Sequence, residues 1–329
     1  MHLPKFEYVR PEGIGHCLML LGELQGRAAV MAGGTDLLAS MGQRLIMPQV
    51  VIGLRALAEL KGVTESADGS LTIAAGTTLT TLREHPAIAA RWPMLHDAIG
   101  AVASTHIRNV ATLGGNLALP TRCWYTNQTE GWRQAREGCY KTDKQACHVL
   151  ATSHKCVATS SADTVPALIV LGASVELRSV RGERSVPLAD FYRDDGAKPT
   201  VIEPDELITA IHIPACAART GFTKVTTREG IDFGLGTIAV SIRGTNRNVQ
   251  SAHIVVNSFG PNPMRLRESE AVLIEQGLTE ASIEAAMAVG REGLGEITSL
   301  WTPAGYKRRL VRVLLSRTLD TIRREKKAA

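Results

Sequence analysis

The chain has 329 residues, of which 44% are hydrophobic and 21% are charged, and its formal net charge is +5. This length and composition predict a globular protein of two or three domains and exclude a disordered or collagen-like chain. Since no apolar run reaches the roughly 18 residues of a membrane span and the first residues lack a basic-then-apolar signal region, we expect a cytoplasmic protein with no membrane span.

The first part of the chain has the pattern of a small α+β unit. Residues 6–9, 29–32 and 49–54 are predicted strands, and residues 15–25 have the apolar spacing of a helix. The second strand ends in Gly33-Gly34-Thr35-Asp36-Leu37, directly before a helical stretch. Glycines let an anion approach the backbone, and amides at a helix start point toward it. This loop could hold a phosphate, although most double glycines are only turns and the sequence is neither G-x-G-x-x-G nor a P-loop.

A second glycine turn follows about 80 residues later. A predicted strand at 71–75 leads to a helical stretch that Pro86 interrupts, and then to a second predicted helix at 92–104. The chain next enters the turn Ala111-Thr112-Leu113-Gly114-Gly115-Asn116. Two glycine turns of similar design suit the two phosphates of a dinucleotide, gripped from opposite sides.

Four of the six cysteines lie in a polar segment between this turn and Asp163, namely Cys123, Cys139, Cys147 and Cys156. A stretch of this length with little apolar periodicity is uncommon inside a compact domain unless it is functional or disordered. Four thiols argue against disorder, because a group coordinated by sulfur can fold such a segment in place of a hydrophobic core.

Three kinds of thiol chemistry are open for this segment. Disulfides need an oxidising compartment, and zinc sites usually take their thiols in closely spaced pairs, which are absent here. Thiolates supplied singly from well-spaced positions suit the corners of an iron–sulfur cubane, which the spacing favours. Cys17 and Cys216 lie far from the four and are most simply packed thiols.

The rest of the chain predicts a second α+β domain. After a short helix at 166–171, strands are expected at 173–180 and 207–213, with a hairpin turn at 181–183. Residues 220–227, 235–243 and 251–257 alternate as antiparallel strands, and helices are expected at 264–276, 279–294 and 303–324. A strand meander capped by helices forms a domain of its own. Basic residues crowd the last helix, but no interleaved aromatics or binding motif accompanies them, so we expect no nucleic-acid partner.

Taken together, the motifs resemble the FAD-binding flavoproteins of the molybdenum hydroxylases, a family that includes the medium subunit of carbon monoxide dehydrogenase and the central domain of xanthine dehydrogenase. The resemblance covers nearly the whole chain in order, and its motifs are Ala32–Leu37, Ala111–Asn116, Asp163-x-x-Pro-Ala-Leu, Lys224-x3-Arg228, Pro263-x-Arg265 and Tyr306-Lys307-Arg308. It implies an α+β fold, with a two-subdomain FAD-binding domain of the PCMH type at 1–215 (subdomains 1–57 and 58–215). A C-terminal α+β domain of the carbon monoxide dehydrogenase flavoprotein type, with an antiparallel sheet and helices, would follow at 216–329.

The cysteine segment, at about 119–159, is an insertion relative to most of that family. It is similar to the insertion in the beta subunits of the 4-hydroxybenzoyl-CoA reductases, which carries a [4Fe–4S] cluster. The similarity rests on Thr121-Arg122-Cys123, Tyr125-x-Asn127-Gln128, Cys147-His148-Val149 and Cys156-x-Ala158-Thr159. It implies that the four cysteines are the ligands of such a cluster.

The resemblance also implies which residues bind FAD. The first glycine loop would contribute Val30, Met31, Ala32, Gly33, Gly34, Thr35, Asp36 and Leu37, and the second would contribute Thr112, Gly115 and Asn116. Asp163 would accept hydrogen bonds from the adenosine ribose, although such a residue is also a common helix N-cap. Lys224 would lie near the pyrimidine edge of the flavin, although a lone strand lysine is usually just solvated. Val102 and Ile208 would contact the flavin.

The implied function is electron transfer without a catalytic residue for an organic substrate. The partners would be a molybdenum-cofactor subunit and a [2Fe–2S] subunit in a heterotrimer that dimerises, and ferredoxin would be the electron donor for removing an aromatic hydroxyl from 4-hydroxybenzoyl-CoA. One alternative is the same subunit in an oxidative molybdenum hydroxylase or aldehyde oxidoreductase. Another, from a different class, is a zinc-stabilised binding module.

Overall fold

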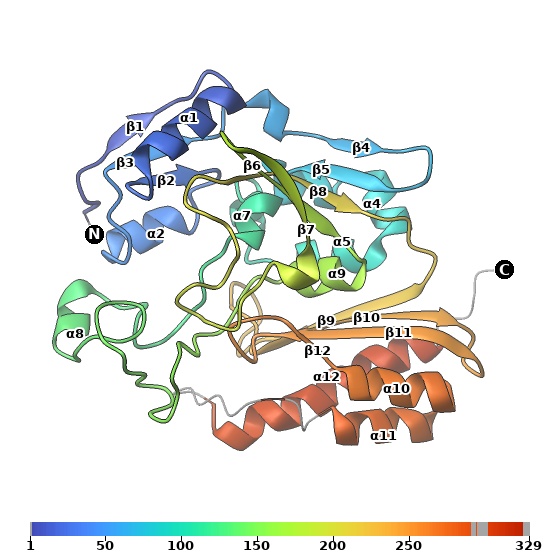
Figure 1. The fold of residues 1–329 in the computed structure, drawn as a ribbon. Coiled ribbons are helices and arrows are strands. Elements are labelled where there is room, and N and C mark those ends of the chain that lie inside the picture. The colour runs from blue at the N-terminus through green and yellow to red at the C-terminus, as the bar shows by residue number, and fades with distance from the viewer. Residues whose placement is uncertain (1, 291–293, 295–301, 325–329) are drawn as a thin grey trace.

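The computed structural model describes residues 2–290, 294 and 302–324, and arranges them around three β-sheets (Figure 1). The N-terminal sheet has three parallel strands in the order β1-β3-β2. Its elements are β1 (Glu7–Val9), α1 (Ile14–Leu24), β2 (Ala28–Met31), α2 (Leu37–Gly42) and β3 (Val50–Gly53). All four residues of β3 are buried, because this strand pairs on both sides and packs in one core with Cys17 and Leu21 of α1. Cys17 is therefore a packed thiol, as expected.

The second sheet has five antiparallel strands in the order β4-β5-β8-β6-β7. Its strands are β4 (Val63–Glu65), β5 (Leu71–Ala74), β6 (Ser174–Ser179), β7 (Gly182–Pro187) and β8 (Leu207–Ile213). The helices in this part of the chain are η1 (Ala58–Leu60), α3 (Leu79–Arg83), α4 (Pro86–Arg91), α5 (Pro93–Gly100), α6 (Thr105–Arg108), α7 (Leu113–Leu117), α9 (Val165–Val170) and η2 (Leu188–Asp190).

Two predictions for this region differ from the structure. The helix expected over 92–104 ends at Gly100, because Ala103 has a φ of +43° and Ser104 caps the separate helix α6 by accepting a hydrogen bond from the Ile107 amide. Strand β4 was not predicted, since it has only three residues, two of them exposed, and therefore carries no burial pattern.

The third sheet has four antiparallel strands in the order β12-β11-β10-β9. Its elements are β9 (Arg219–Val225), β10 (Gly236–Gly244), β11 (Val249–Asn257), β12 (Met264–Arg265), α10 (Arg267–Gln276), α11 (Glu280–Val289) and α12 (Ala304–Arg324). The helix expected from residue 264 begins three residues later, because Met264 and Arg265 pair with β11 instead. The helix expected over 279–294 runs to Val289, and residues 291–293 lie outside the described part of the chain.

Both faces of this third sheet are covered. Helices α10, α11 and α12 lie together on one side of it (Figure 1), where Ile238, Val240 and Ile242 of β10 join their core. Ala239 of the same strand faces the other way and belongs to the core of the second sheet, and helices α5 and α9 contact β9, β10 and β11 there. Because β10 is buried on both faces, five consecutive residues of it are buried.

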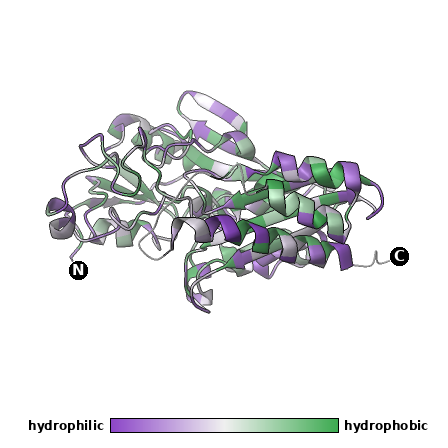
Figure 2. Cartoon of the chain, turned by 90° about the horizontal axis from the view of Figure 1, so that it is seen from below, coloured by the Kyte–Doolittle hydropathy of each residue, from purple (hydrophilic) through white to green (hydrophobic). Residues whose placement is uncertain are grey.

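Helix α12 is amphipathic. Leu310, Val311, Leu314, Leu315, Leu319 and Ile322 are buried, at the spacing of one helix face. Figure 2 shows hydrophilic and hydrophobic residues alternating along the helices of this layer. Among the residues that the structure describes, no helix is both long and apolar enough to cross a membrane.

The insertion is a loop with one short helix, α8 (Glu130–Gln134), and it extends from the body of the molecule on the side of α2 (Figure 1). Its base is closed by an antiparallel bridge between Arg122 and Thr159, with backbone hydrogen bonds of 2.8 and 3.0 Å. Between residues 122 and 155 only Thr126 is buried. The insertion therefore has almost no core of its own, as the sequence predicted.

Candidate functional site

A pocket of about 1550 Å³ lies where the first sheet, the second sheet, the insertion and the loop after β9 meet. This volume exceeds the roughly 300–1,000 Å³ of most small-ligand pockets, as a dinucleotide requires. Every predicted FAD-binding residue except Lys224 lines it, namely Val30, Met31, Ala32, Gly33, Gly34, Thr35, Asp36, Leu37, Val102, Thr112, Gly115, Asn116, Asp163 and Ile208.

The two glycine turns touch each other in this pocket. A Cβ on Gly33 would collide with the carbonyl of Val110, so only glycine lets the first turn rest on the chain that enters the second. Gly34 has a φ of +72°, in the left-handed region that favours glycine. The turns therefore form one continuous backbone surface, which sequence alone could only suggest from their similar design.

The second turn is fixed by its own side chains. The Thr112 hydroxyl accepts a 3.1 Å hydrogen bond from the Gly115 amide and so caps α7. A Cβ on Gly114 would lie 2.8 Å from the Cβ of Ala75, so this glycine lets α7 approach the end of β5. Asn116 is buried and accepts a 2.6 Å hydrogen bond from the Thr164 hydroxyl, which ties the second turn to the segment that carries Asp163.

Asp163, which lines the pocket, forms a buried ion pair with Lys224, which does not. The Lys224 ammonium lies 2.7 Å from Asp163 Oδ2, and it also donates to the carbonyls of Ala101 at 2.8 Å and Asp232 at 3.1 Å. Burial raises the pKa of Asp163 to about 6, although Lys224 opposes the rise, so the carboxylate is still ionised at pH 7.

Asp163 and Lys224 therefore lie together at the site, whereas the resemblance implies that they bind different parts of FAD, and those two roles stay predictions. The other carboxylate oxygen, Oδ1, has no hydrogen-bond partner among the described residues, and neither has the hydroxyl of Ser161. Both side chains line the pocket and can bond with the hydroxyl groups of a bound FAD, so the pocket fits this cofactor.

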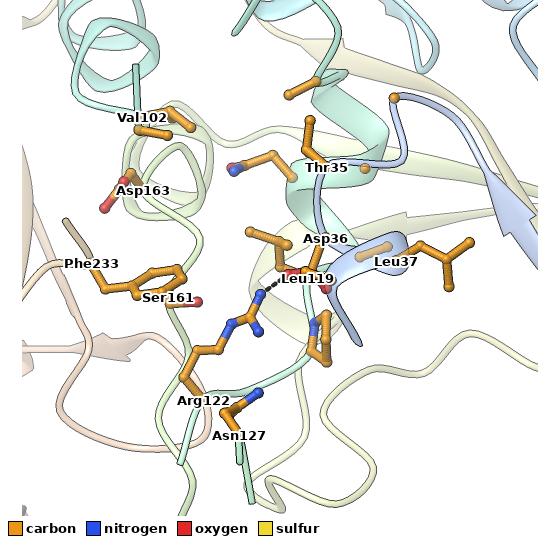
Figure 3. A pocket seen from close by; sticks show the side chains of 18 of the residues that line it. Thr35, Asp36, Leu37, Val102, Leu119, Arg122, Asn127, Ser161, Asp163 and Phe233 are labelled. Atoms are coloured by element: carbon orange, nitrogen blue, oxygen red, sulfur yellow. Dashed lines mark ion pairs between the residues drawn. The ribbon is translucent and has the colours of Figure 1, made fainter. Parts of the chain in front are cut away.

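Several pocket residues were not predicted as site residues, and Arg122 lies among them (Figure 3). Its guanidinium pairs with Asp36 of the first glycine turn and lies 5.1 Å from the centre of the Phe233 ring. Burial lowers the pKa of Arg122. Arg122 stands in the Thr121-Arg122-Cys123 motif of the resemblance, but that motif carried no expected role for it, and its partners are far away along the chain.

Lys307 is a second such residue. Its buried ammonium donates a 2.6 Å hydrogen bond to the Ser258 carbonyl, and burial lowers its pKa to about 8. Lys307 stands in one of the motifs of the resemblance, which could have marked it, but that motif carried no expected role.

The cysteines are brought together only in part. The half-buried Lys141 ammonium donates a 2.6 Å hydrogen bond to the Thr121 carbonyl and lies close enough to Cys156, Cys123 and Cys139 to interact electrostatically with their thiolates. Cys123 also lines the pocket, whereas Cys147 accepts a hydrogen bond from its own loop, at the Leu150 amide. None of the six cysteines is in a disulfide. Within the described part of the chain, no three or more His, Cys, Asp or Glu side chains are arranged to hold a metal ion, so the thiols as placed do not fit a cluster.

Comparison with known proteins identifies the family. Residues 4–216 match the family described as the FAD binding domain in molybdopterin dehydrogenase, and residues 222–322 match the CO dehydrogenase flavoprotein C-terminal domain. The carbon monoxide dehydrogenase medium chain of Hydrogenophaga pseudoflava is 25% identical over 319 residues, which cover 96% of each chain. The aldehyde oxidoreductase FAD-binding subunit PaoB of Escherichia coli is 32% identical over 256 residues, which cover 75% of this chain and 79% of that subunit.

Solved structures agree with this assignment. The structure of reconstituted CO dehydrogenase from Oligotropha carboxidovorans superposes with a TM-score of 0.81 at 26% identity, covering 98% of this chain and 99% of that chain. The predicted fold class is thereby confirmed. The chain belongs to the FAD-binding family of the molybdopterin dehydrogenases, and it is an FAD-binding oxidoreductase subunit of the molybdenum hydroxylase class.

Proposed function

We propose that this chain is the electron-transfer subunit of a molybdenum enzyme, with FAD in the pocket and a [4Fe–4S] cluster in the insertion. When bound, FAD supplies two-electron exchange and the cluster supplies one-electron transfer. The observation that carries the proposal is that Cys123 lines the same pocket as both glycine turns and belongs to the insertion that holds the other three cysteines. The site for one-electron chemistry would then adjoin the flavin.

The insertion would reach its final arrangement only with the metal. It has almost no buried side chains, so the free energy of binding a sulfur-coordinated group would order it. The cluster ligands would be Cys123, Cys139, Cys147 and Cys156.

The partners would be a molybdenum-cofactor subunit and a [2Fe–2S] subunit in a heterotrimer. The names of the relatives support an assembly, since they are a medium chain, a medium subunit and an FAD-binding subunit. FAD would fill the pocket, so the organic substrate would react in the molybdenum-cofactor subunit. This family membership also sets aside a zinc-stabilised module without redox chemistry.

The direction of electron flow has two candidates. The cysteine segment resembles that of the 4-hydroxybenzoyl-CoA reductases, which favours reductive flow from ferredoxin to an aromatic thioester in the cytoplasm. The relatives include a CO dehydrogenase, a nicotine 6-hydroxylase and an aldehyde oxidoreductase, and these names favour an oxidative hydroxylase or aldehyde oxidoreductase instead. We favour the reductive direction, because the insertion is the feature that separates this chain from most of the family.

Rapid mixing of the whole complex, purified without oxygen, tests both points. Reduced ferredoxin should lower the flavin and iron–sulfur absorbance, and a hydroxyaroyl-CoA should then restore it. Iron analysis should give four irons per chain beyond those of the partners. Oxidation of an aldehyde or heterocycle with no response to the thioester would establish the oxidative alternative, and zinc in place of iron would refute the cluster.

A further inference from the structure

The glycine turns alone do not neutralise the negative charge that the FAD pyrophosphate would bring into the pocket. The pyrophosphate of FAD carries two negative charges. Five acidic side chains line the pocket, of which Asp163 and Glu206 are paired with Lys224 and Arg184 outside the lining, and the other three are Asp36, Glu203 and Asp232. The basic side chains among the described lining residues are Arg122, Arg228 and Lys307. Backbone amides supply partial charge only, and the Gly115 amide is already bonded to Thr112. A cation at the glycine turns would balance the phosphates.

Of the three basic residues, only Arg122 is shown in contact with a glycine turn. Lys307 donates its hydrogen bond to Ser258, on the C-terminal side of the pocket. The Arg228 side chain is 70% exposed and lies 3.9 Å from Asp232. Arg122 instead pairs with Asp36 at the end of the first turn, and Figure 3 shows its side chain extending across the pocket toward Asp36.

We propose that Arg122 binds the FAD pyrophosphate, and that Asp36 holds its guanidinium at the first glycine turn until the cofactor arrives. A guanidinium presents five N–H donors in a planar fork that matches phosphate oxygens in pairs. The Nε atom of Arg122 is buried and has no hydrogen-bond partner within the described chain, so the side chain has donor capacity that Asp36 does not use.

The surroundings of Arg122 position it for this role. Its backbone is fixed by the bridge to Thr159 at the base of the insertion, and its guanidinium lies beside the Phe233 ring from the loop after β9. A cation over an aromatic face keeps its N–H edge free for an anion. The insertion would thus complete the flavin site, in addition to any cluster that it carries. The inference rests on FAD binding and does not depend on the cluster.

Titration of the flavin-free full chain with FAD, ADP and riboflavin tests this role. We expect Arg122→Met to weaken FAD and ADP binding roughly 10- to 100-fold, since charge-assisted hydrogen bonds to phosphate are lost. Riboflavin, which lacks phosphate, should bind both proteins equally. Arg136→Met is the matched control, because Arg136 lies in the same insertion at the same 5.1 Å from an aromatic ring, that of Trp132, but does not line the pocket.

The Asp36→Asn variant distinguishes phosphate binding by Arg122 from a purely structural role of the Arg122–Asp36 ion pair. If Arg122 binds phosphate, Asp36→Asn should weaken FAD binding much less than Arg122→Met does, because the guanidinium and the backbone amide of residue 36 are both retained. If the ion pair only holds the pocket together, Asp36→Asn weakens FAD binding as much as Arg122→Met does, and the proposal is overturned. It is equally overturned if Arg122→Met loses riboflavin together with FAD, or keeps wild-type affinity for ADP. Should Arg122→Met not fold, Arg122→Lys and Asp36→Asn make the same comparison, and iron content reports separately on the cluster.

Discussion

Replacing Lys224 by Met should leave a carboxylate unpaired in the interior. Lys224 belongs to β9 of the third sheet, whereas its partners Asp163 and Ala101 belong to the part of the chain that carries the glycine turns. The side chains of Lys224 and Asp163 are only 9% and 7% exposed. Breaking such a pair by removing one partner costs roughly 3–5 kcal/mol, because the remaining charge is desolvated without compensation. We expect this loss in the free energy of unfolding at pH 8.

The loss should depend on pH in a defined direction. The folded-state pKa of Asp163 is about 6, above the ordinary value of 3.8, so the wild-type protein loses stability as the pH rises through this interval. Without Lys224 the pKa rises further, and the carboxyl group is then protonated and neutral at pH 5. The cost of Lys224→Met should therefore fall at pH 5 to about 1–2 kcal/mol, which reflects the hydrogen bonds lost by the Ala101 and Asp232 carbonyls.

Urea unfolding of the full chain at pH 5 and pH 8 measures this difference. In an Asp163→Asn background, Lys224→Met should cost the same small amount at both pH values. Lys198→Met is the control, since Lys198 is exposed and its loss should change stability by less than about 0.5 kcal/mol. An equal cost of Lys224→Met at pH 5 and pH 8 would refute the reasoning, as would a full cost in the Asp163→Asn background.

Three further outcomes are expected. Gly34→Val should lower the FAD content of the purified protein, because a β-branched residue is strained at a φ of +72°, whereas Gly131→Val in an open part of the insertion should not. Cys139→Ser should lower the iron content of the complex measured by colorimetric assay, and Cys17→Ser should leave it unchanged, since Cys17 is buried in the core of the first sheet. Leu314→Ala should lower the free energy of unfolding by roughly 2–5 kcal/mol in denaturant titrations, because this fully buried side chain joins α12 to the third sheet.

The sequence predicted elements well where burial repeats with a local period. The strands of the third sheet and helix α1 follow from that pattern, and both glycine turns follow from their composition. Helix α5 was predicted too long. Ala103 has a positive φ in the folded chain, and this cannot be predicted from the sequence because alanine rarely adopts such a φ and is common in helices. Strand β12 was read as helix, since two residues that pair with β11 continue smoothly into α10.

The parts of the site that could be predicted are those with a recognisable local sequence motif. The glycine turns and Asp163 each carry a local signature, and the structure places all of them on one pocket. Arg122 stands in a motif of the resemblance, but its role in the pocket could not be predicted, because Asp36 and Phe233 contact it from sequence separations that no local pattern encodes. The Asp163–Lys224 contact could not be predicted for the same reason, since 61 positions separate the two residues along the chain.

The third sheet, which is covered by helices on both faces, limits how this chain can be divided. A fragment that ends near residue 216 would leave α5 and α9 without the strands that cover them, and the remaining fragment would expose Ala239 and Val255 to water. Each of the two family-matched segments would therefore expose apolar residues to water if it were produced alone. Expression of either half alone should give insoluble material, and gene fusions or recombination events that preserve the fold should carry both halves together.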